Sequence, residues 1–337
     1  MRNILVSLLV NVGDVIMMTS ALELTRRGRP QVGLTVLVRP EAAELFEGNP
    51  AADGAIIYPY RSGSLFHGLG SLRRQIKDGG FDYFLSLDRR PRGAAAAWLG
   101  GIKTRVGPNL LFAGSRPEGW TRWLFTQEVQ MTREECDGDL AEMFQTFTRR
   151  ALNLEGSGRI TLPPVSPENR AWADSLFQEA AGPVIGLCVK TNDPSKTWPA
   201  ANYAALMAGL KAELGAFLYV TGAPGDRDYV QAVIEAAKAG PILNLAGRTS
   251  LMGLGALAAQ SDLYITPDNG SGHIAANCGQ QNIICILRAT PSAKQLLFSM
   301  PQARFLAFPP TGPAAEEDRN QIDLVLKTAR ELLKSDH

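Results

Sequence analysis

The sequence predicts an α/β protein made of two parallel sheets, each covered by helices on both faces. Short runs rich in Val, Ile and Leu alternate with segments of helical spacing in both halves of the chain. The 337 residues exceed one typical domain. A stretch with two adjacent prolines, residues 156–167, separates the halves as a linker would. We therefore expect two Rossmann-like domains, residues 1–160 and 168–337.

The expected elements of the first half alternate between strands and helices. Its apolar runs have the length of strands that are buried on both faces of a parallel sheet. The segments between them carry apolar residues at helical spacing. The expected strands are residues 4–10, 34–38, 55–58 and 83–87, and the expected helices are residues 15–26, 41–48, 69–77, 93–99 and 139–152.

The second half repeats this alternation and ends with an amphipathic helix. Ligands of parallel sheets bind outside the carboxyl ends of the strands, so a cleft between the two domains is the expected site. The expected strands are residues 184–189, 216–221, 263–266 and 283–287, and the expected helices are residues 200–214, 226–239, 251–260, 273–278 and 318–334.

The composition is typical of a soluble globular protein, with 45% hydrophobic and 20% charged residues. No apolar run reaches the roughly 18 to 20 residues that a membrane span needs. The first apolar run meets Asp14 too early for a secretory signal, so we expect a cytoplasmic protein. The four cysteines show no C-x-x-C spacing, which indicates reduced thiols and no zinc site.

The charge of the chain is unevenly distributed although its net value is only +1. Residues 61–122 contain eleven Lys and Arg against four acids, a local excess of +7. This excess favours an anionic partner for the first half, and a solvated basic face explains it equally well. No nucleic-acid-binding motif is visible, so nucleic acid is not an expected partner.

The most informative stretch is residues 261–288, in which an apolar strand, a Gly-rich turn and a short helix follow one another. A helix amino terminus presents unpaired N–H groups to an anion such as a diphosphate. Gly270 and Gly272 allow the backbone to approach such a ligand closely. Asp268 and His273 are the only acid and imidazole of the turn. Taken alone, Asp268 is also explained as a helix cap.

A second motif, N-V-G-D at residues 11–14, directly follows the first expected strand. Gly13 permits a tight turn, and Asp14 then stands at the start of the next helix. A carboxylate at this place can take the proton from an attacking sugar hydroxyl as a general base. An N-cap aspartate would occupy the same position, so both interpretations stay open.

A third motif, T-N-D-P-S-K-T-W-P at residues 191–199, follows the first strand of the second half. Lys196 can neutralise phosphate oxygens of a leaving nucleotide, and Thr191 and Asn192 can add hydrogen bonds. The alternative is a solvated loop lysine beside a core tryptophan, Trp198.

Several motifs of other enzyme classes are absent from the sequence. There is no G-x-G-x-x-G for a nicotinamide or flavin and no G-K-[ST] of a P-loop. There is also no H-E-x-x-H, and the three histidines are too scattered for a zinc site. No G-x-S-x-G marks a hydrolase nucleophile. We therefore expect neither a metal nor a cofactor.

Four motifs in this order resemble the bacterial lipopolysaccharide heptosyltransferases of glycosyltransferase family 9. They are I-L-V with V-G-D-V near the start, L-V-R-P-E with E-G-N-P at residues 37–50, S-K-T-W-P at 195–199, and D-N-G-S-G-H with its helix at 268–279. The resemblance covers nearly the whole chain.

The resemblance implies a GT-B fold and inverting transfer of heptose from ADP-heptose to an anionic inner-core glycolipid. It also implies that the last helix packs back toward the first domain and that Asp14 is the catalytic base. A lipid-linked acceptor would bring peripheral contact with the inner face of the inner membrane. The residues implied in donor binding are Thr191, Asn192, Lys196, Asp268, Asn269, Gly270, Ser271, Gly272 and His273, and those implied in acceptor binding are Asn11, Gly13, Arg61, Arg89, Arg92 and Arg122.

The chain departs from the family pattern at four places. Asn269 replaces Ser or Thr after the loop aspartate, Pro224 replaces an acid, Arg288 lies in an altered L-R-A-T-P segment, and Ser20 replaces a proline. Transfer of another nucleotide-linked sugar therefore stays open. So do a non-catalytic subunit that binds a nucleotide sugar and, less strongly, a sugar epimerase of the same fold.

Overall fold

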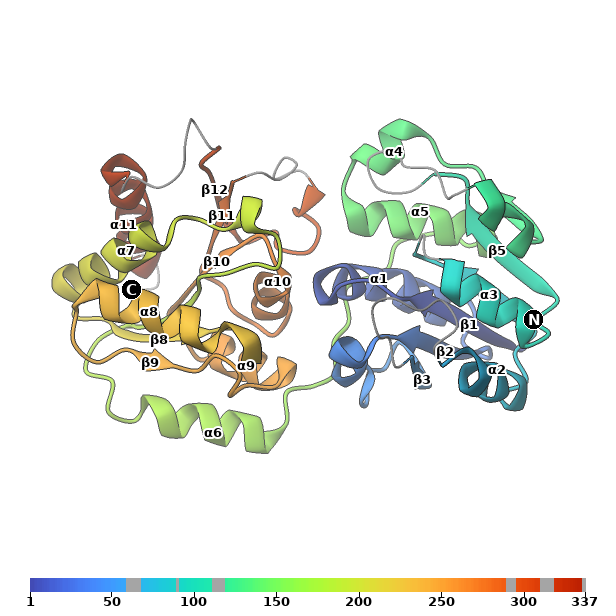
Figure 1. Ribbon diagram of the computed structural model, residues 1–337, viewed down its shortest axis with the longest axis horizontal. Coiled ribbons are helices and arrows are strands. Elements are labelled where there is room, and N and C mark those ends of the chain that lie inside the picture. The colour runs from blue at the N-terminus through green and yellow to red at the C-terminus, as the bar shows by residue number, and fades with distance from the viewer. Residues whose placement is uncertain (59–67, 89–90, 111–118, 289–294, 310–317, 335–337) are drawn as a thin grey trace. The chain divides into compact units, whose positions relative to one another are not determined.

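The computed structural model consists of two compact units, Met1–Pro163 with Lys294–Ser299, and Pro164–Ala293 with Met300–His337 (Figure 1). The structure describes residues 1–58, 68–88, 91–110, 119–288, 295–309 and 318–334. Each unit contains one six-stranded sheet, and all the strand pairs are parallel. The expected α/β class is therefore confirmed.

The sheet of the first unit has the strand order β3-β2-β1-β4-β5-β6. Its strands are β1 (Asn3–Leu8), β2 (Gly33–Val38), β3 (Gly54–Ile57), β4 (Tyr83–Ser86), β5 (Thr104–Pro108) and β6 (Gln127–Val129). Its helices are α1 (Val12–Gly28), α2 (Leu69–Asp78), α3 (Pro91–Leu99), α4 (Arg133–Asp137) and α5 (Leu140–Leu152), with the 3-10 helices η1 (Pro40–Phe46) and η2 (Gly119–Leu124).

The core of the first unit forms because β1 is apolar along its whole length. Ile4 and Leu5 are completely buried, as expected for a central strand that is covered on both faces. Leu72 of α2 and Ala94 of α3 join one apolar cluster with Leu5. Helix α1 packs against α5. A layer of helices therefore holds the turn after β1, which carries the N-V-G-D motif.

The sheet of the second unit has the order β12-β11-β10-β7-β8-β9. Its strands are β7 (Val184–Cys188), β8 (Phe217–Thr221), β9 (Leu243–Asn244), β10 (Leu263–Pro267), β11 (Ile283–Leu287) and β12 (Arg304–Ala307). Its helices are α6 (Pro167–Phe177), α7 (Ala200–Leu214), α8 (Arg227–Ala237), α9 (Leu251–Ala259), α10 (Gly270–Asn277) and α11 (Arg319–Lys334), with the 3-10 helices η3 (Pro194–Lys196) and η4 (Pro224–Asp226).

Helix α11 packs on α7 within the second unit. Gly209 makes this approach possible, because a Cβ there would lie 2.7 Å from a methyl group of Leu326. Val325 and Ala329 are completely buried in the same apolar cluster. The expected packing of this helix toward the first domain stays a prediction.

The segment after β11 contributes to the first unit, which the sequence did not indicate. Phe298 N donates to Asp139 Oδ2 (2.9 Å), and Gln295 Nε2 donates to Asp137 O (3.3 Å). Asp139 is also the N-cap of α5, where its Oδ1 accepts from Ala141 N (2.9 Å). One partly buried carboxylate therefore holds both the start of α5 and this segment.

Each sheet has a switch point where the chain reverses its direction of strand addition. In the first unit this point lies between β1 and β4, and in the second it lies between β7 and β10. Loops at the carboxyl ends of two such strands diverge and leave room for a ligand. In the part of the chain that the structure describes, no helix is long and apolar enough to cross a membrane.

Candidate functional site

Three loops lie at one edge of the second unit's sheet, two of which the sequence analysis singled out. The loop after β7 carries Lys190 and Lys196, the loop after β10 carries Asp268, and the loop after β8 carries Asp226. β7 lies between β10 and β8 in the sheet. Because parallel strands end at the same edge, their loops place these charged side chains near the switch point.

Lys196 and Asp268 form an ion pair that joins the first two loops. Lys196 Nζ lies 2.7 Å from Asp268 Oδ2. The Asp268 side chain is only 9% exposed, whereas that of Lys196 is 31% exposed. η3 positions the lysine, because Asp193 caps it by accepting from Ser195 N (3.0 Å). The hypothesis of a purely solvated loop lysine is therefore wrong.

Trp198 anchors the loop that carries Lys196, as the alternative interpretation predicted. Its indole is completely buried, stacks on Phe308 and meets Tyr203 edge to face. Its Nε1 donates to Gln321 Oε1 (2.7 Å). The loop is thus fixed at one end by the core while Lys196 faces the strand ends.

The other two residues predicted in this loop differ in their availability to a ligand. The Thr191 hydroxyl is engaged within the loop, where it donates to Asp193 O and accepts from Asp193 N (3.1 Å). Thr191 is buried, whereas Asn192 is exposed. Of the two, only Asn192 presents its side chain to solvent.

Asn269, and not Asp268, caps helix α10. Asn269 Oδ1 accepts from Ser271 N (3.0 Å), and Asn269 Nδ2 donates to Lys190 O (3.1 Å). The interpretation of Asp268 as a simple helix cap is therefore wrong. The asparagine that departs from the family pattern holds the helix start and ties it to the loop after β7.

The two glycines of the turn have different surroundings. Gly270 is the first residue of α10 and is partly exposed, so its backbone is open to a ligand. Gly272 is buried, and a Cβ there would lie 2.9 Å from Thr266 Cγ2 and 3.1 Å from Met300 Sδ. The structure therefore explains Gly272 by close packing of α10 on its own unit.

His273 lies in the first turn of α10, interacts electrostatically with both members of the ion pair, and is only 2% exposed. Burial lowers the pKa of its imidazole, Lys196 lowers it further, and Asp268 opposes both. The side chain is therefore neutral at pH 7, when one ring nitrogen donates and the other accepts. It supports the loop from within the unit.

A second charged cluster, missed by the sequence reasoning, follows β7 and β8. Lys190 Nζ pairs with Asp226 Oδ1 at 2.6 Å and lies 5.2 Å from the ring centroid of Tyr229. Asp226 Oδ2 also accepts from Ala223 N (3.2 Å). Pro224 stands where the family has an acid, but Asp226 supplies one two residues later.

Asp14 occupies the corresponding edge of the first unit. It lies in the first turn of α1 and is partly buried. The N-cap position is held by Asn11, whose side chain makes no capping hydrogen bond, so Asp14 is not an N-cap aspartate. Gly13 lies between them, within the helix. The carboxylate therefore stands beside the amide groups of a helix start, where negative charge is stabilised.

Asp88, at the end of β4, is a further acid that the sequence reasoning did not select. It is 1% exposed, and its Oδ2 accepts from Ser7 Oγ (2.5 Å) and Leu9 N (2.8 Å). These bonds connect the ends of β4 and β1 across the switch point. Gly93 allows α3 to lie close to this junction, because a Cβ there would meet Ser7 Oγ at 2.3 Å.

Of the two predicted acceptor arginines that the structure describes, Arg92 lies at this edge and Arg122 does not. Arg61 and Arg89 lie outside the described residues. Arg92 is partly buried in the first turn of α3. Arg122 in η2 pairs with Glu128 at 3.1 Å, just before the chain enters the amino end of β6.

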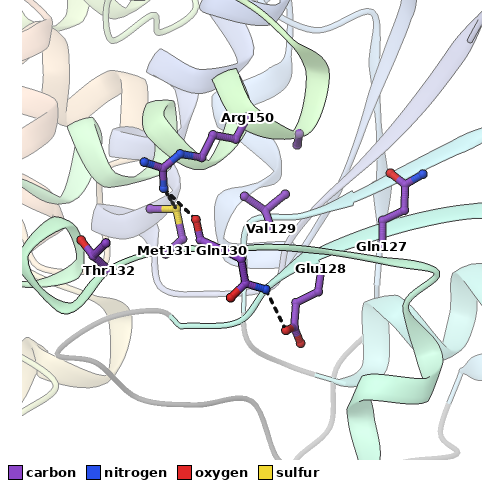
Figure 2. A pocket seen from close by; sticks show the side chains of 8 residues that line it. Gln127, Glu128, Val129, Gln130, Met131, Thr132 and Arg150 are labelled. Carbon is purple, nitrogen blue, oxygen red and sulfur yellow. Dashed lines mark hydrogen bonds between the residues drawn. The ribbon is translucent and has the colours of Figure 1, made fainter.

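A hollow of about 720 Å³ lies beside β6 in the first unit, and Glu128, the partner of Arg122, is one of its lining residues (Figure 2). Arg150 donates to Gln130 O (2.7 Å), and its guanidinium pairs with Glu135 at 2.6 Å. This pairing lowers the pKa of Glu135 to about 2. Since the charges that border it are paired with each other, this hollow is a poor anion site.

No group of three or more His, Cys, Asp or Glu side chains that could hold a metal ion occurs among the described residues. The strand ends of the second unit instead carry two Lys–Asp pairs, with a helix start beside one of them. Two parallel sheets with such strand ends define an α/β protein of the GT-B type, the class of many glycosyltransferases.

The sequence profile of glycosyltransferase family 9 (heptosyltransferase) matches residues 69–294, so the chain belongs to this family and is a glycosyltransferase. It is 23% identical over 271 residues to the lipopolysaccharide core heptosyltransferase OpsX of Haemophilus influenzae, covering 80% of this chain and 74% of that protein. Heptosyl transfer in lipopolysaccharide biosynthesis is therefore supported at the family level.

Two solved structures share the fold along nearly the whole chain. The glycosyltransferase family 9 protein of Veillonella parvula has a TM-score of 0.79 at 22% identity, covering 99% of this chain and 97% of that one. ADP-heptose LPS heptosyltransferase II of E. coli has a TM-score of 0.77 at 21% identity, covering 100% and 99%. The predicted GT-B fold is thereby confirmed.

Proposed function

We propose that this protein transfers a heptose from ADP-heptose to an inner-core lipopolysaccharide acceptor with inversion at the anomeric carbon. The observation that carries the proposal is the Lys196–Asp268 pair beside the start of α10 at the switch point of the second unit. The E. coli relative is an ADP-heptose LPS heptosyltransferase, which supports the donor, and OpsX is a lipopolysaccharide core heptosyltransferase, which supports the acceptor class.

The second unit supplies the donor site in this proposal. Lys196 neutralises the diphosphate, and the amide groups at the start of α10 bind its oxygens. Gly270 leaves the backbone open there, while Asn269 and Ser271 hold the helix start in place. Positive charge already fixed at the leaving group stabilises the transition state, in which negative charge develops on the diphosphate.

Asp226 extends the donor site toward the nucleoside. An acid after the second strand of a Rossmann-like unit commonly accepts hydrogen bonds from a ribose. Asp226 follows β8, the second strand of its unit, and Lys190 holds its carboxylate at 2.6 Å. We assign Asp226 to the ribose hydroxyls, so recognition of the nucleobase depends on other contacts.

Asp14 acts as the general base on the acceptor side. In a single displacement, the acceptor hydroxyl loses its proton as its oxygen attacks the anomeric carbon, and the diphosphate leaves from the opposite face. Asn11 and Gly13 border Asp14 on the same turn and would contact the acceptor. The arginines Arg61, Arg89 and Arg92 are proposed to meet its anionic groups, whereas Arg122 lies before the amino end of β6 and is not assigned to the acceptor. We also propose that the enzyme works at the inner face of the inner membrane.

The test compares Asp14→Asn with the control Glu168→Gln. Both carboxylates lie in the first turn of a helix, α1 and α6 respectively, so both variants lose a similar interaction with the helix dipole. We expect Asp14→Asn to lose at least about 100-fold in transfer rate while its ADP affinity is unchanged. Glu168→Gln keeps both.

Calorimetry with ADP, UDP and GDP accompanies the transfer assay. A preference for UDP or GDP would show that the donor is not ADP-heptose. Full activity of Asp14→Asn would refute the role of Asp14 as the general base. Nucleotide binding without turnover by the wild type on heptose-deficient lipopolysaccharide would favour the non-catalytic subunit.

A further inference from the structure

Among the described side chains of the first unit, two tryptophans are exposed. Trp98 in α3 is 56% exposed and Trp123 in η2 is 83% exposed, whereas Trp198 in the second unit is completely buried. Leu99, next to Trp98, is 39% exposed. Aromatic side chains gain much from burial, and grouped apolar side chains that remain in water often mark a contact surface.

These side chains belong to one surface, formed by α2, α3 and η2 and here called the α2–α3–η2 surface. α3 contacts both α2 and η2, and α2 and α3 are labelled close together in Figure 1. Arg73 Nε of α2 donates to Leu99 O at the end of α3 (2.9 Å). Leu124, the neighbour of Trp123, packs on the apolar cluster that includes the inner side of α3.

The charge of this surface is positive. Its described acids are Asp78, Asp82 and Glu128; Asp82 pairs with the amino terminus and Glu128 with Arg122. The exposed Lys and Arg side chains exceed these acids by two. These cations are Arg73, Arg74, Lys77, Lys103 and Arg122.

The aromatic part of the surface lies away from the edge that carries Asp14. Trp98 and Leu99 end α3, and the chain then turns into the amino end of β5. Asp14 follows the carboxyl end of β1, and in a parallel sheet these ends lie at opposite edges. The exposed tryptophans therefore serve a different purpose from the candidate catalytic group.

We propose that the α2–α3–η2 surface docks the protein on a bilayer that contains anionic phospholipids. Tryptophan favours the boundary between headgroups and acyl chains, where its ring is buried and its N–H stays hydrated. Lysine and arginine around it are attracted by the negative surface potential. A second copy of the chain fits less well, because two such faces would bring like charges together.

Vesicle sedimentation with the full chain tests this proposal without any donor or acceptor, so its outcome is independent of the proposed function. The vesicles contain phosphatidylethanolamine with phosphatidylglycerol, or phosphatidylcholine alone. We expect Trp98→Ser/Trp123→Ser to lower partitioning on the anionic vesicles about tenfold. Arg74→Gln/Lys77→Gln should lower partitioning on the anionic vesicles about 25-fold, because each cation that is removed weakens binding about fivefold.

The matched control is Leu324→Ser, since Leu324 is 43% exposed on α11 of the second unit. It should partition like the wild type, and thermal melts verify that each variant is folded. Equal binding of the wild type and both double variants would overturn the proposal, as would a wild type that binds neither vesicle. A wild-type dimer that the tryptophan variant dissociates would also overturn it, by identifying a second copy as the occupant.

Discussion

Removing the Lys196 ammonium should destabilise the second unit and weaken nucleotide binding together. The ammonium and the Asp268 carboxylate are 2.7 Å apart, and the carboxylate is 9% exposed. At an effective dielectric constant of about 20 their direct attraction is about 6 kcal/mol. Desolvation of both ions offsets most of it, so we expect a net coupling of about 2 kcal/mol.

The assay is a double-mutant cycle of Lys196→Met and Asp268→Asn followed by urea unfolding. Lys196→Met leaves a buried carboxylate without this cation, and we expect it to cost about 3 kcal/mol. Asp268→Asn leaves a lysine that reaches solvent, and it should cost about 1 kcal/mol. The free energy of unfolding of the double variant should be about 2 kcal/mol lower than that of the wild type. Additive effects would lower it by about 4 kcal/mol, so the difference of about 2 kcal/mol measures the coupling.

Calorimetry with ADP completes the cycle. Lys196→Met should bind ADP about 10- to 100-fold more weakly, because a charge-assisted contact to the diphosphate is lost. Asp268→Asn should bind ADP at least as tightly as the wild type, since the carboxylate no longer competes for the lysine. The control pair, Lys327 and Glu331 at 4.0 Å and about two-thirds exposed, should show almost no coupling.

Additive effects of Lys196→Met and Asp268→Asn on the free energy of unfolding, within about 0.5 kcal/mol, would refute the coupling. Unchanged ADP affinity in Lys196→Met would refute the assignment of this lysine to the diphosphate. The two results are independent, so a structural pair without a donor role would be recognised as such.

Three further predictions concern groups that support the site. Asn269→Ala should lower the free energy of unfolding by about 2 kcal/mol, because the α10 cap and the bond to the Lys190 carbonyl are lost, and Asn269→Ser, which restores the cap, should recover about half of it in urea unfolding. Asp88→Asn should cost about 2 kcal/mol and reduce kcat about tenfold while ADP affinity stays constant, since the turn before Asp14 loosens. His273 has a lowered pKa when folded, so the unfolded chain binds more protons, and stability present above about pH 6.5 is lost as the pH falls. The melting temperature of His273→Gln should decline less steeply than that of the wild type between pH 7.5 and 5.5, and parallel profiles would contradict this account.

The sequence predicted the central strands and the edge strand β3, and it missed β5, β6, β9 and β12. Central strands are buried on both faces and therefore appear as continuous apolar runs. β6, β9 and β12 are short or partly exposed, and an edge strand is specified mainly by the neighbour on which it pairs. β5, with the sequence T-R-V-G-P, has no apolar run either.

Helix α6 was missed for a different reason. It is not among the expected helices, although Ser166 followed by Pro167 is a common start of a helix. Only Ala173 of the helix is buried, so its apolar residues show little helical periodicity. The helix start at Ser166 and Pro167 was therefore not supported by a periodic pattern after it. The segment 41–48 was predicted as a helix, and the structure gives it as the 3-10 helix η1.

Local sequence predicted the loop carrying Asp268, Asn269 and His273, because a strand, a Gly-rich turn and a helix lie together in the chain. It could not show that Lys196, 72 residues away, pairs with Asp268, since this requires β10 to lie beside β7. Asp226 was missed likewise, because its importance depends on Lys190 of the neighbouring loop.

The two sheets have the same topology, with the first strand between the second and the fourth. Equivalent strand ends nevertheless carry different charged groups, carboxylates in the first unit and Lys–Asp pairs in the second. The first unit places the carboxylates of Asp14 and Asp88 at its switch point, and the second places the ammonium groups of Lys190 and Lys196 at the corresponding edge. A displacement at an anomeric carbon requires a base for the incoming alcohol and cationic stabilisation of the leaving diphosphate. Exchange of these charges, as in Asp14→Lys or Lys196→Asp, should therefore abolish transfer even in a variant that keeps its wild-type stability.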